Sequence, residues 1–151
     1  MPVIAPLPME ALDAESLERI EAGLATGMYS QTLPLQVVAR APAAMRAMDE
    51  GYKAMFRRSL LDDRLRELLR VRSALLNGCG PCSQSRKEDS VSEDDVECLA
   101  DPEAANYSRR ERLALKFLTL MCTDHHAITP ATYLQLAEEF TTAEIVELGW
   151  T

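Results

Sequence analysis

The sequence is poor in aromatic residues and contains no convincing run of alternating apolar and polar residues. Phe, Trp and Tyr make up 5% of its 151 residues, whereas apolar residues as a whole reach 47%. Without such alternation a β-sheet fold is not expected, and the abundance of Ala, Leu, Met and Glu favours helices. The length, together with the absence of a visible internal repeat, indicates one domain with enough apolar material for a core.

Basic residues are also in the minority. Lys and Arg number 16 against 24 Asp and Glu, which gives a formal net charge of −8. There is no basic stripe to neutralise phosphates, so we expect no nucleic-acid partner. No apolar run is long enough to span a membrane, and residues 1–8 lack the basic start of a signal peptide. We therefore expect a cytoplasmic protein without a membrane partner, in which a permanent structural disulfide is not expected.

The order of the chain can be read from prolines, capping signals and apolar spacing. Residues 1–8 contain three prolines and are expected to form an extended arm, followed by a single helical domain over residues 9–151. The predicted helices cover residues 9–25, 34–40, 42–58, 62–77, 81–89, 92–99, 108–122 and 129–140, with another starting near 141. Short connections between them predict an all-α multi-helix bundle.

The stretch over residues 67–86 carries the strongest indication of chemistry. An apolar helix that ends at Gly78 is followed at once by Cys79-Gly80-Pro81-Cys82. This spacing lets both thiols lie on the first turn of a helix, where free N–H groups and the positive end of the dipole favour a thiolate. One sulfur can then attack as a nucleophile, and the other can resolve a sulfenic acid or a mixed disulfide. The pair is predicted to be a two-electron redox switch.

A carboxylate precedes this pair on the same helix. Glu67 lies about three helical turns before Cys79, on the face that leads to the thiols. A carboxylate near a thiol can act as a general base, directly or through water. The alternative is a solvated Glu67 that only pairs with Arg70, one turn further along.

These residues resemble the signature of a known superfamily. The matching positions are Glu67, Leu69, Arg70, Arg72, Leu76, Asn77, Gly78, Cys79 and Cys82, and the similarity continues in residues 107–118, 124–128 and 144–148. Together they look like the alkyl hydroperoxidase D / carboxymuconolactone decarboxylase superfamily. The resemblance implies an alkyl hydroperoxidase D-like helical bundle that assembles as a homotrimer or homohexamer. Because members usually continue with one more long apolar helix, it also implies that this domain lacks its last helix.

The resemblance further implies an activity. In the thiol-dependent branch, the cysteine pair reduces a hydroperoxide substrate and is regenerated by a dithiol reductant protein, without a cofactor. There a Glu, the thiols and a His four residues after the second Cys form a proton relay. The His position is Arg86 here, and an Arg does not shuttle protons near neutral pH, although its charge favours a thiolate, as does that of Lys87.

The predicted catalytic residues are therefore Cys79, Cys82, Glu67 and Arg86. The order of attack stays open at this point. Helix-end electrostatics favour Cys79 as the attacking sulfur, whereas the resemblance favours Cys82.

Other functions were weighed against this one. The change at Arg86 leaves open a family member with impaired or no peroxidase activity. A lactone decarboxylase of the same superfamily is a second alternative, but those members lack the paired thiols. Cys-Gly-Pro-Cys is also the active-site tetrapeptide of thioredoxins, whose fold needs strands around the motif. A zinc site held by the pair needs a second pair of ligands, and none follows in the sequence.

The remaining candidate residues are predicted to be structural. Cys98 and Cys122 are isolated, and Cys122 is expected in the core. Asp124-His125-His126 contains good metal ligands. Adjacent histidines point in different directions, however, and no third ligand has the right spacing, so we expect no metal.

Overall fold

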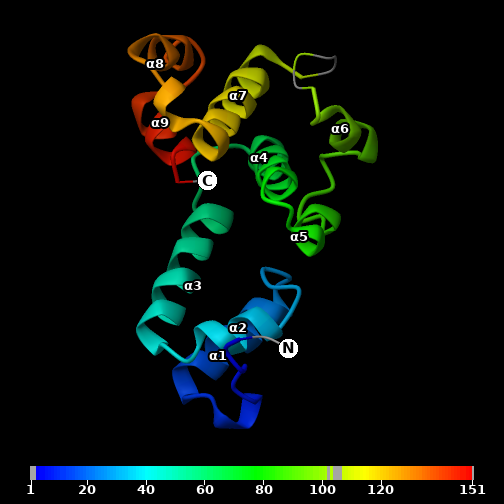
Figure 1. The fold of residues 1–151 in the computed structure, drawn as a ribbon, viewed down its shortest axis with the longest axis vertical. Coiled ribbons are helices and arrows are strands. Elements are labelled where there is room, and N and C mark those ends of the chain that lie inside the picture. The colour runs from blue at the N-terminus through cyan, green and yellow to red at the C-terminus, as the bar shows by residue number, and fades with distance from the viewer. Residues whose placement is uncertain (1–2, 102, 104–106, 151) are drawn as a thin grey trace. The chain divides into compact units, whose positions relative to one another are not determined.

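The computed structural model describes residues 3–101, 103 and 107–150, and this part of the chain is helical with no strand (Figure 1). The all-α prediction is confirmed. Two short 3-10 helices, η1 (Met9–Ala11) and η2 (His125–Ala127), accompany the α-helices. The α-helices are α1 (Ala14–Ala25), α2 (Leu33–Val38), α3 (Pro42–Arg57), α4 (Asp63–Leu76), α5 (Gly80–Gln84), α6 (Glu93–Cys98), α7 (Arg109–Thr123), α8 (Pro130–Leu136) and α9 (Thr142–Leu148).

The chain divides into two compact units, the first ending at Arg58 and the second beginning at Ser59. The first contains α1 to α3 around a small core of Ile20, Tyr29, Leu35, Ala39 and Met45. Of the predicted arm, residues 1–2 lie outside the described residues. Residues 3–8 are not helical, and the amide of Leu7 donates to the carbonyl of Gln36 at 3.2 Å. None of the described helices is both long enough and apolar enough to cross a membrane.

A buried carboxylate lies at the centre of the first unit. Asp49 on α3 has 0% exposure, and its oxygens accept from Arg19 (2.5 Å), Lys53 (2.6 Å) and the Tyr29 hydroxyl (3.0 Å). Burial raises the pKa of Asp49, but the hydrogen bonds from Lys53, Arg19 and Tyr29 outweigh it, so the pKa lies below its usual value. The ionised form is thus stabilised by folding.

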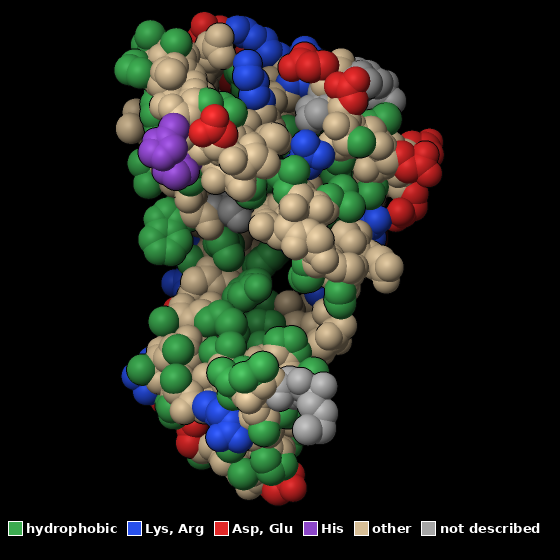
Figure 2. All heavy atoms as spheres, viewed as in Figure 1, with side chains coloured by type: hydrophobic (Ala, Val, Ile, Leu, Met, Phe, Trp, Pro, Cys, Tyr) green, Lys and Arg blue, Asp and Glu red, His purple; other side chains and the backbone are tan. Residues whose placement is uncertain are grey.

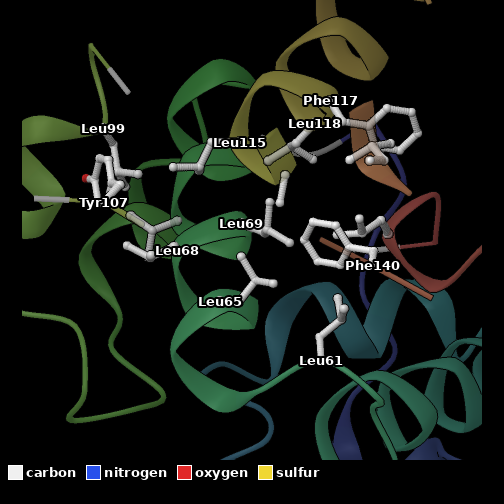
Figure 3. Packing of buried hydrophobic residues seen from close by; sticks show 14 of the residues in the cluster. Leu61, Leu65, Leu68, Leu69, Leu99, Tyr107, Leu115, Phe117, Leu118 and Phe140 are labelled. Carbon is white, nitrogen blue, oxygen red and sulfur yellow. The ribbon is translucent and has the colours of Figure 1, made fainter. Parts of the chain in front are cut away.

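The second unit is built around α4. Leu65, Leu68 and Leu69 on α4 belong to the same buried cluster as Leu115 and Leu118 of α7, as Figure 3 shows. The same core takes in further buried side chains from the segments that follow α5 and α7: Val91, Leu99, Tyr107, Leu136, Phe140 and Leu148. The C-terminal end of α4 leads through residues 77–79 into α5.

Capping residues set where the helices of this unit begin. Asp62 accepts from the amide of Leu65 at 2.9 Å, and capping boxes are present at Ser92, Ser108 and Thr141. The acidic stretch between residues 88 and 103 includes exposed side chains on α6, and Figure 2 shows acidic side chains gathered on that part of the surface.

Arg64 joins three helices of the second unit. Its guanidinium on α4 binds Asp95 of α6 at 2.8 Å and Glu111 of α7 at 2.8 Å. Asp95 and Glu111 are also the N3 residues of the capping boxes at the starts of α6 and α7. The hydrogen bond from Arg64 lowers the pKa of Asp95. One cation thus fixes the starts of α6 and α7 against α4.

The end of α4 is a Schellman turn that leads into the cysteine pair. The amide of Cys79 donates to the carbonyl of Ala74 at 2.9 Å, and that of Gly78 to Leu75 at 3.2 Å. Gly78 has φ of +64°, a left-handed conformation that residues with a side chain adopt at a cost. Local sequence therefore fixes where the cysteines begin.

We predict that Gly78→Ala lowers the free energy of unfolding by about 1–2 kcal/mol, because a Cβ is strained at this φ. The matched control is Gly80→Ala, since Gly80 lies outside the left-handed region and an added Cβ there meets no atom within 4 Å. Urea denaturation followed by circular dichroism measures both. Equal stability of the two variants would contradict the assignment of the turn.

We also predict that Asp49→Asn lowers stability by about 3 kcal/mol at pH 7, because Arg19 and Lys53 lose their buried partner. Since the folded pKa of Asp49 is depressed, its contribution is complete above the unfolded pKa of about 3.9 and is lost as pH falls through the folded pKa. The difference in the free energy of unfolding between Asp49→Asn and the wild type should therefore be larger at pH 7 than at pH 3. Glu50→Gln, at an exposed neighbour, should change little at either pH.

Candidate functional site

The two cysteines of the motif lie at the start of α5 and are joined in a disulfide. Cys79 is the residue before the helix and Cys82 lies within it, with 5.3 Å between their Cα atoms. Cys79 is half-buried, whereas Cys82 is exposed together with Gly80 and Pro81. The sulfur pair therefore lies at the surface of the second unit, and Cys82 is the more exposed of the two cysteines.

The helix that carries the pair is shorter than predicted. The sequence predicted a helix to residue 89, but α5 ends at Gln84 and Ser85 is extended. The reason is tertiary: the carbonyls of Cys82 and Ser85 accept from Arg70 at 2.7 and 2.5 Å instead of from amides further along the chain. A single turn has little dipole, so the electrostatic argument from the helix end loses most of its weight.

Glu67 is buried and paired. Its side chain has 1% exposure and forms a two-point ion pair with Arg70, in which Nε and Nη2 donate to separate carboxylate oxygens at 2.7 Å each. One oxygen also accepts from the backbone amide of Lys87 at 2.9 Å. The pairing with Arg70 is present, but the interpretation of Glu67 as a solvated residue is wrong. A carboxylate buried this deeply needs such donors, because an unpaired charge in the interior is costly.

Arg70 links this carboxylate to the cysteine segment. Its guanidinium contacts Glu67 with one edge and the carbonyls of Cys82 and Ser85 with the other N–H groups. The sequence indicated only the pairing of Arg70 with Glu67. The further contacts of Arg70 with the cysteine segment depend on how the chain turns back after α4, which no local spacing specifies.

Arg86 holds the other side of the same segment. It donates to the carbonyls of Ser83 at 2.6 Å and Ser85 at 3.1 Å, and it pairs with Glu93 of α6 at 2.9 Å through two nitrogens. Cations near the carboxyl end of a helix satisfy its free carbonyls. Arg86 thus caps α5 and ties it to α6.

Lys87 adds a third cation beside the buried pair. Burial lowers the pKa of the Lys87 ammonium, and the charge of Arg70 lowers it further, while Glu67 acts in the opposite direction. Arg70, Arg86 and Lys87 therefore surround the end of α5 with positive charge, balanced by Glu67 and Glu93. Cations favour the thiolate form of a nearby cysteine, but two of these three are paired with carboxylates.

The other candidate residues lie elsewhere. Cys98 is partly buried and packs against the core, but Cys122 is exposed, so the prediction of a core position for it is wrong. The two histidines, purple in Figure 2, are exposed with ring centroids 4.0 Å apart. Within the part of the chain that the structure describes, no group of three or more metal-binding side chains is close enough to hold an ion.

We predict that Arg70→Met lowers the free energy of unfolding by about 3 kcal/mol, because it leaves the buried Glu67 carboxylate without its ion-pair partner. Arg72→Met is the matched control, since Arg72 lies on the same helix and, among the described residues, donates a single long hydrogen bond, of 3.4 Å, to Thr119. Chemical denaturation gives both values. Adding Glu67→Gln to Arg70→Met should recover part of the loss, and equal costs for the two arginines would contradict the importance of the pair.

The chain was compared with known proteins. Residues 42–120 match a sequence model described as the carboxymuconolactone decarboxylase family. None of the curated proteins matches. Among solved structures, the fold is similar to the crystal structure of an alkylhydroperoxidase AhpD core, an uncharacterized peroxidase-related protein from Ralstonia eutropha JMP134. The TM-score is 0.77 at 21% identity, over 99% of this chain and 83% of that one. At this identity the similarity establishes a shared fold.

Proposed function

Since the chain belongs to the carboxymuconolactone decarboxylase family, we propose that it is a thiol-dependent oxidoreductase that reduces hydroperoxides with its Cys79–Cys82 pair. The observation that carries the proposal is a disulfide across a Cys-x-x-Cys spacing, in which Cys82 is exposed and the segment is anchored to a buried carboxylate. A lactone decarboxylase finds no comparable support, because that reaction has no use for the paired sulfurs.

The chemistry proceeds in three balanced steps. A thiolate attacks the outer oxygen of the hydroperoxide, so that the O–O bond breaks, a sulfenic acid forms, and the alcohol leaves with one proton. The second thiol then displaces water from the sulfenic acid and forms the disulfide. An external dithiol protein transfers two electrons and two protons to the disulfide and is itself oxidised.

The exposure of the two cysteines supports different tasks for their sulfurs. Cys82 is accessible to a hydroperoxide and to a partner protein, whereas Cys79 is half-buried at the end of α4. Cys82 is therefore the attacking sulfur and Cys79 the resolving one. This assignment follows the family resemblance rather than the helix-end argument, which a single-turn α5 supports only weakly.

Glu67 is the proton acceptor of the site. It takes the proton of the attacking thiol through an intervening water and returns it to the departing alcohol, so no external proton is needed. Arg86 takes no part in proton transfer, since its guanidinium stays charged and is engaged with Ser83 and Glu93. Its contribution is a fixed positive charge at the end of α5.

The second unit also has exposed apolar side chains, which supports the expected homotrimer or homohexamer. Those with the largest exposure are Leu60, Leu75, Met121, Tyr133, Leu134, Val146 and Trp150. Burial of such side chains against another copy is favourable. Light scattering gives the assembly size.

We predict that reduced protein treated with a hydroperoxide loses two hydrogens, and that peptide mapping by mass spectrometry finds the bond between Cys79 and Cys82. Cys79→Ser should leave a sulfenic acid on Cys82 that dimedone traps, and Cys82→Ser should leave none. The assay uses a Cys122→Ser background, because Cys122 is also exposed. A pair that stays reduced would contradict the proposal.

We predict that Arg86→His raises the rate of peroxide turnover by about tenfold or more, because an imidazole can transfer a proton near neutral pH. Arg86→Lys is the control, since it keeps a charge without adding a proton relay. The measurement is steady-state reduction of hydroperoxide with a dithiol. Fast oxidation of the wild type without turnover would instead identify a disulfide exchange module, the family member with impaired peroxidase activity.

A further inference from the structure

One side chain connects the buried carboxylate of the site to the segment that carries the sulfurs. We propose that Arg70 is a positioning residue that holds residues 79–85 in the conformation required by the disulfide and thereby sets the reduction potential of the Cys79–Cys82 pair. The inference rests on the proposed redox function of that pair, but its test does not require a hydroperoxide.

The contacts of Arg70 span both halves of the site. Nε and Nη2 bind the two oxygens of Glu67 at 2.7 Å each, Nη1 binds the carbonyl of Cys82 at 2.7 Å, and Nη2 also binds that of Ser85 at 2.5 Å. A guanidinium is planar, so four such bonds fix its orientation. With 15% exposure for Arg70 and 1% for Glu67, the arrangement is held inside the packed second unit rather than in solvent.

The segment that Arg70 holds has little stability of its own. The helix α5 is one turn long, and the backbone hydrogen bonds from Ser83 to Cys79 and from Ser85 to Pro81 lie at its two ends. A single helical turn is unfavourable in isolation, because several dihedral angles are fixed for each bond gained. Its conformation therefore depends on contacts from outside the turn.

Glu67 also binds the backbone just beyond this segment. Its carboxylate accepts from the amide of Lys87 at 2.9 Å, two residues beyond the Ser85 carbonyl that Arg70 binds. The ion pair thus contacts the backbone at three places, Cys82, Ser85 and Lys87. Arg86 also contacts this segment, but its partner Glu93 is 73% exposed, so that pair is a weaker anchor.

A thermodynamic cycle gives the direction of the effect. The disulfide restricts the segment, so docking of the oxidised segment onto Arg70 costs less conformational entropy than docking of the reduced one. Coupling is reciprocal, and Arg70 must therefore stabilise the disulfide relative to the dithiol. Its charge acts in the opposite sense by favouring thiolates, but the adjacent Glu67 carboxylate neutralises it, so the conformational effect prevails.

The experiment measures the equilibrium between the protein pair and dithiothreitol at pH 7. Oxidised dithiothreitol accepts two electrons and two protons from the protein dithiol and leaves it as the disulfide. Samples are quenched with an alkylating reagent, and mass spectrometry gives the fractions of protein in the dithiol and disulfide forms. The variants are Arg70→Met and Arg70→Lys, with Arg72→Met as the control on the same helix. Arg70→Lys keeps a cation for Glu67, so it stays folded even if Arg70→Met does not.

The expected result is an equilibrium constant for disulfide formation about tenfold lower in Arg70→Met, which corresponds to a potential about 30 mV less negative. Arg70→Lys should fall between this value and the wild type, because one ammonium cannot bind the carboxylate and both carbonyls together. Arg72→Met should match the wild type. A purely structural role for Arg70 would lower the melting temperature without moving the potential.

The outcomes separate this inference from the proposed function. An unchanged potential in folded Arg70→Lys, or an equal change in Arg72→Met, would overturn the role of Arg70. A pair that equilibrates with dithiothreitol in the predicted order but never reacts with hydroperoxide would support the role of Arg70 and reject only the peroxidase.

Discussion

The ion pair between Glu67 and Arg70 is the constraint on which the site depends. A carboxylate with 1% exposure cannot remain charged inside the second unit without close donors, and Arg70 supplies two of them. The remaining N–H groups of the same guanidinium donate to the carbonyls of Cys82 and Ser85. The need to satisfy one buried charge thus determines where the cysteine segment lies.

This arrangement divides the site into a rigid part and an exposed part. The rigid part is α4, packed on α7 by its leucines and closed by the Schellman turn at Gly78. The exposed part is the single turn of α5, where Cys82 faces solvent. A redox pair that exchanges electrons with another protein needs accessible sulfurs, and a defined potential needs a fixed geometry. Anchoring a short exposed turn to a buried ion pair meets both requirements.

Arg86 stands where the family pattern has a histidine, and it has a structural role in this protein. The sequence presented it as the loss of a relay histidine. In the structure the guanidinium caps α5 and pairs with Glu93, so the residue has a structural task of its own. Two arginines, at positions 70 and 86, then share the carbonyls at the end of α5, and this explains why the helix stops at Gln84.

The sequence by itself determined the helical class, the family and the positions where most helices begin, because capping boxes such as those at Ser92, Ser108 and Thr141 are interactions within one turn. It also located the cysteine pair, since Gly78 sets the turn before it. Only the tertiary structure decided the length of α5, the exposure of Cys122, the burial of Glu67 and the ion cluster around Asp49. These features depend on which segments of the chain the fold brings together, and no local pattern of residues specifies which of them will meet.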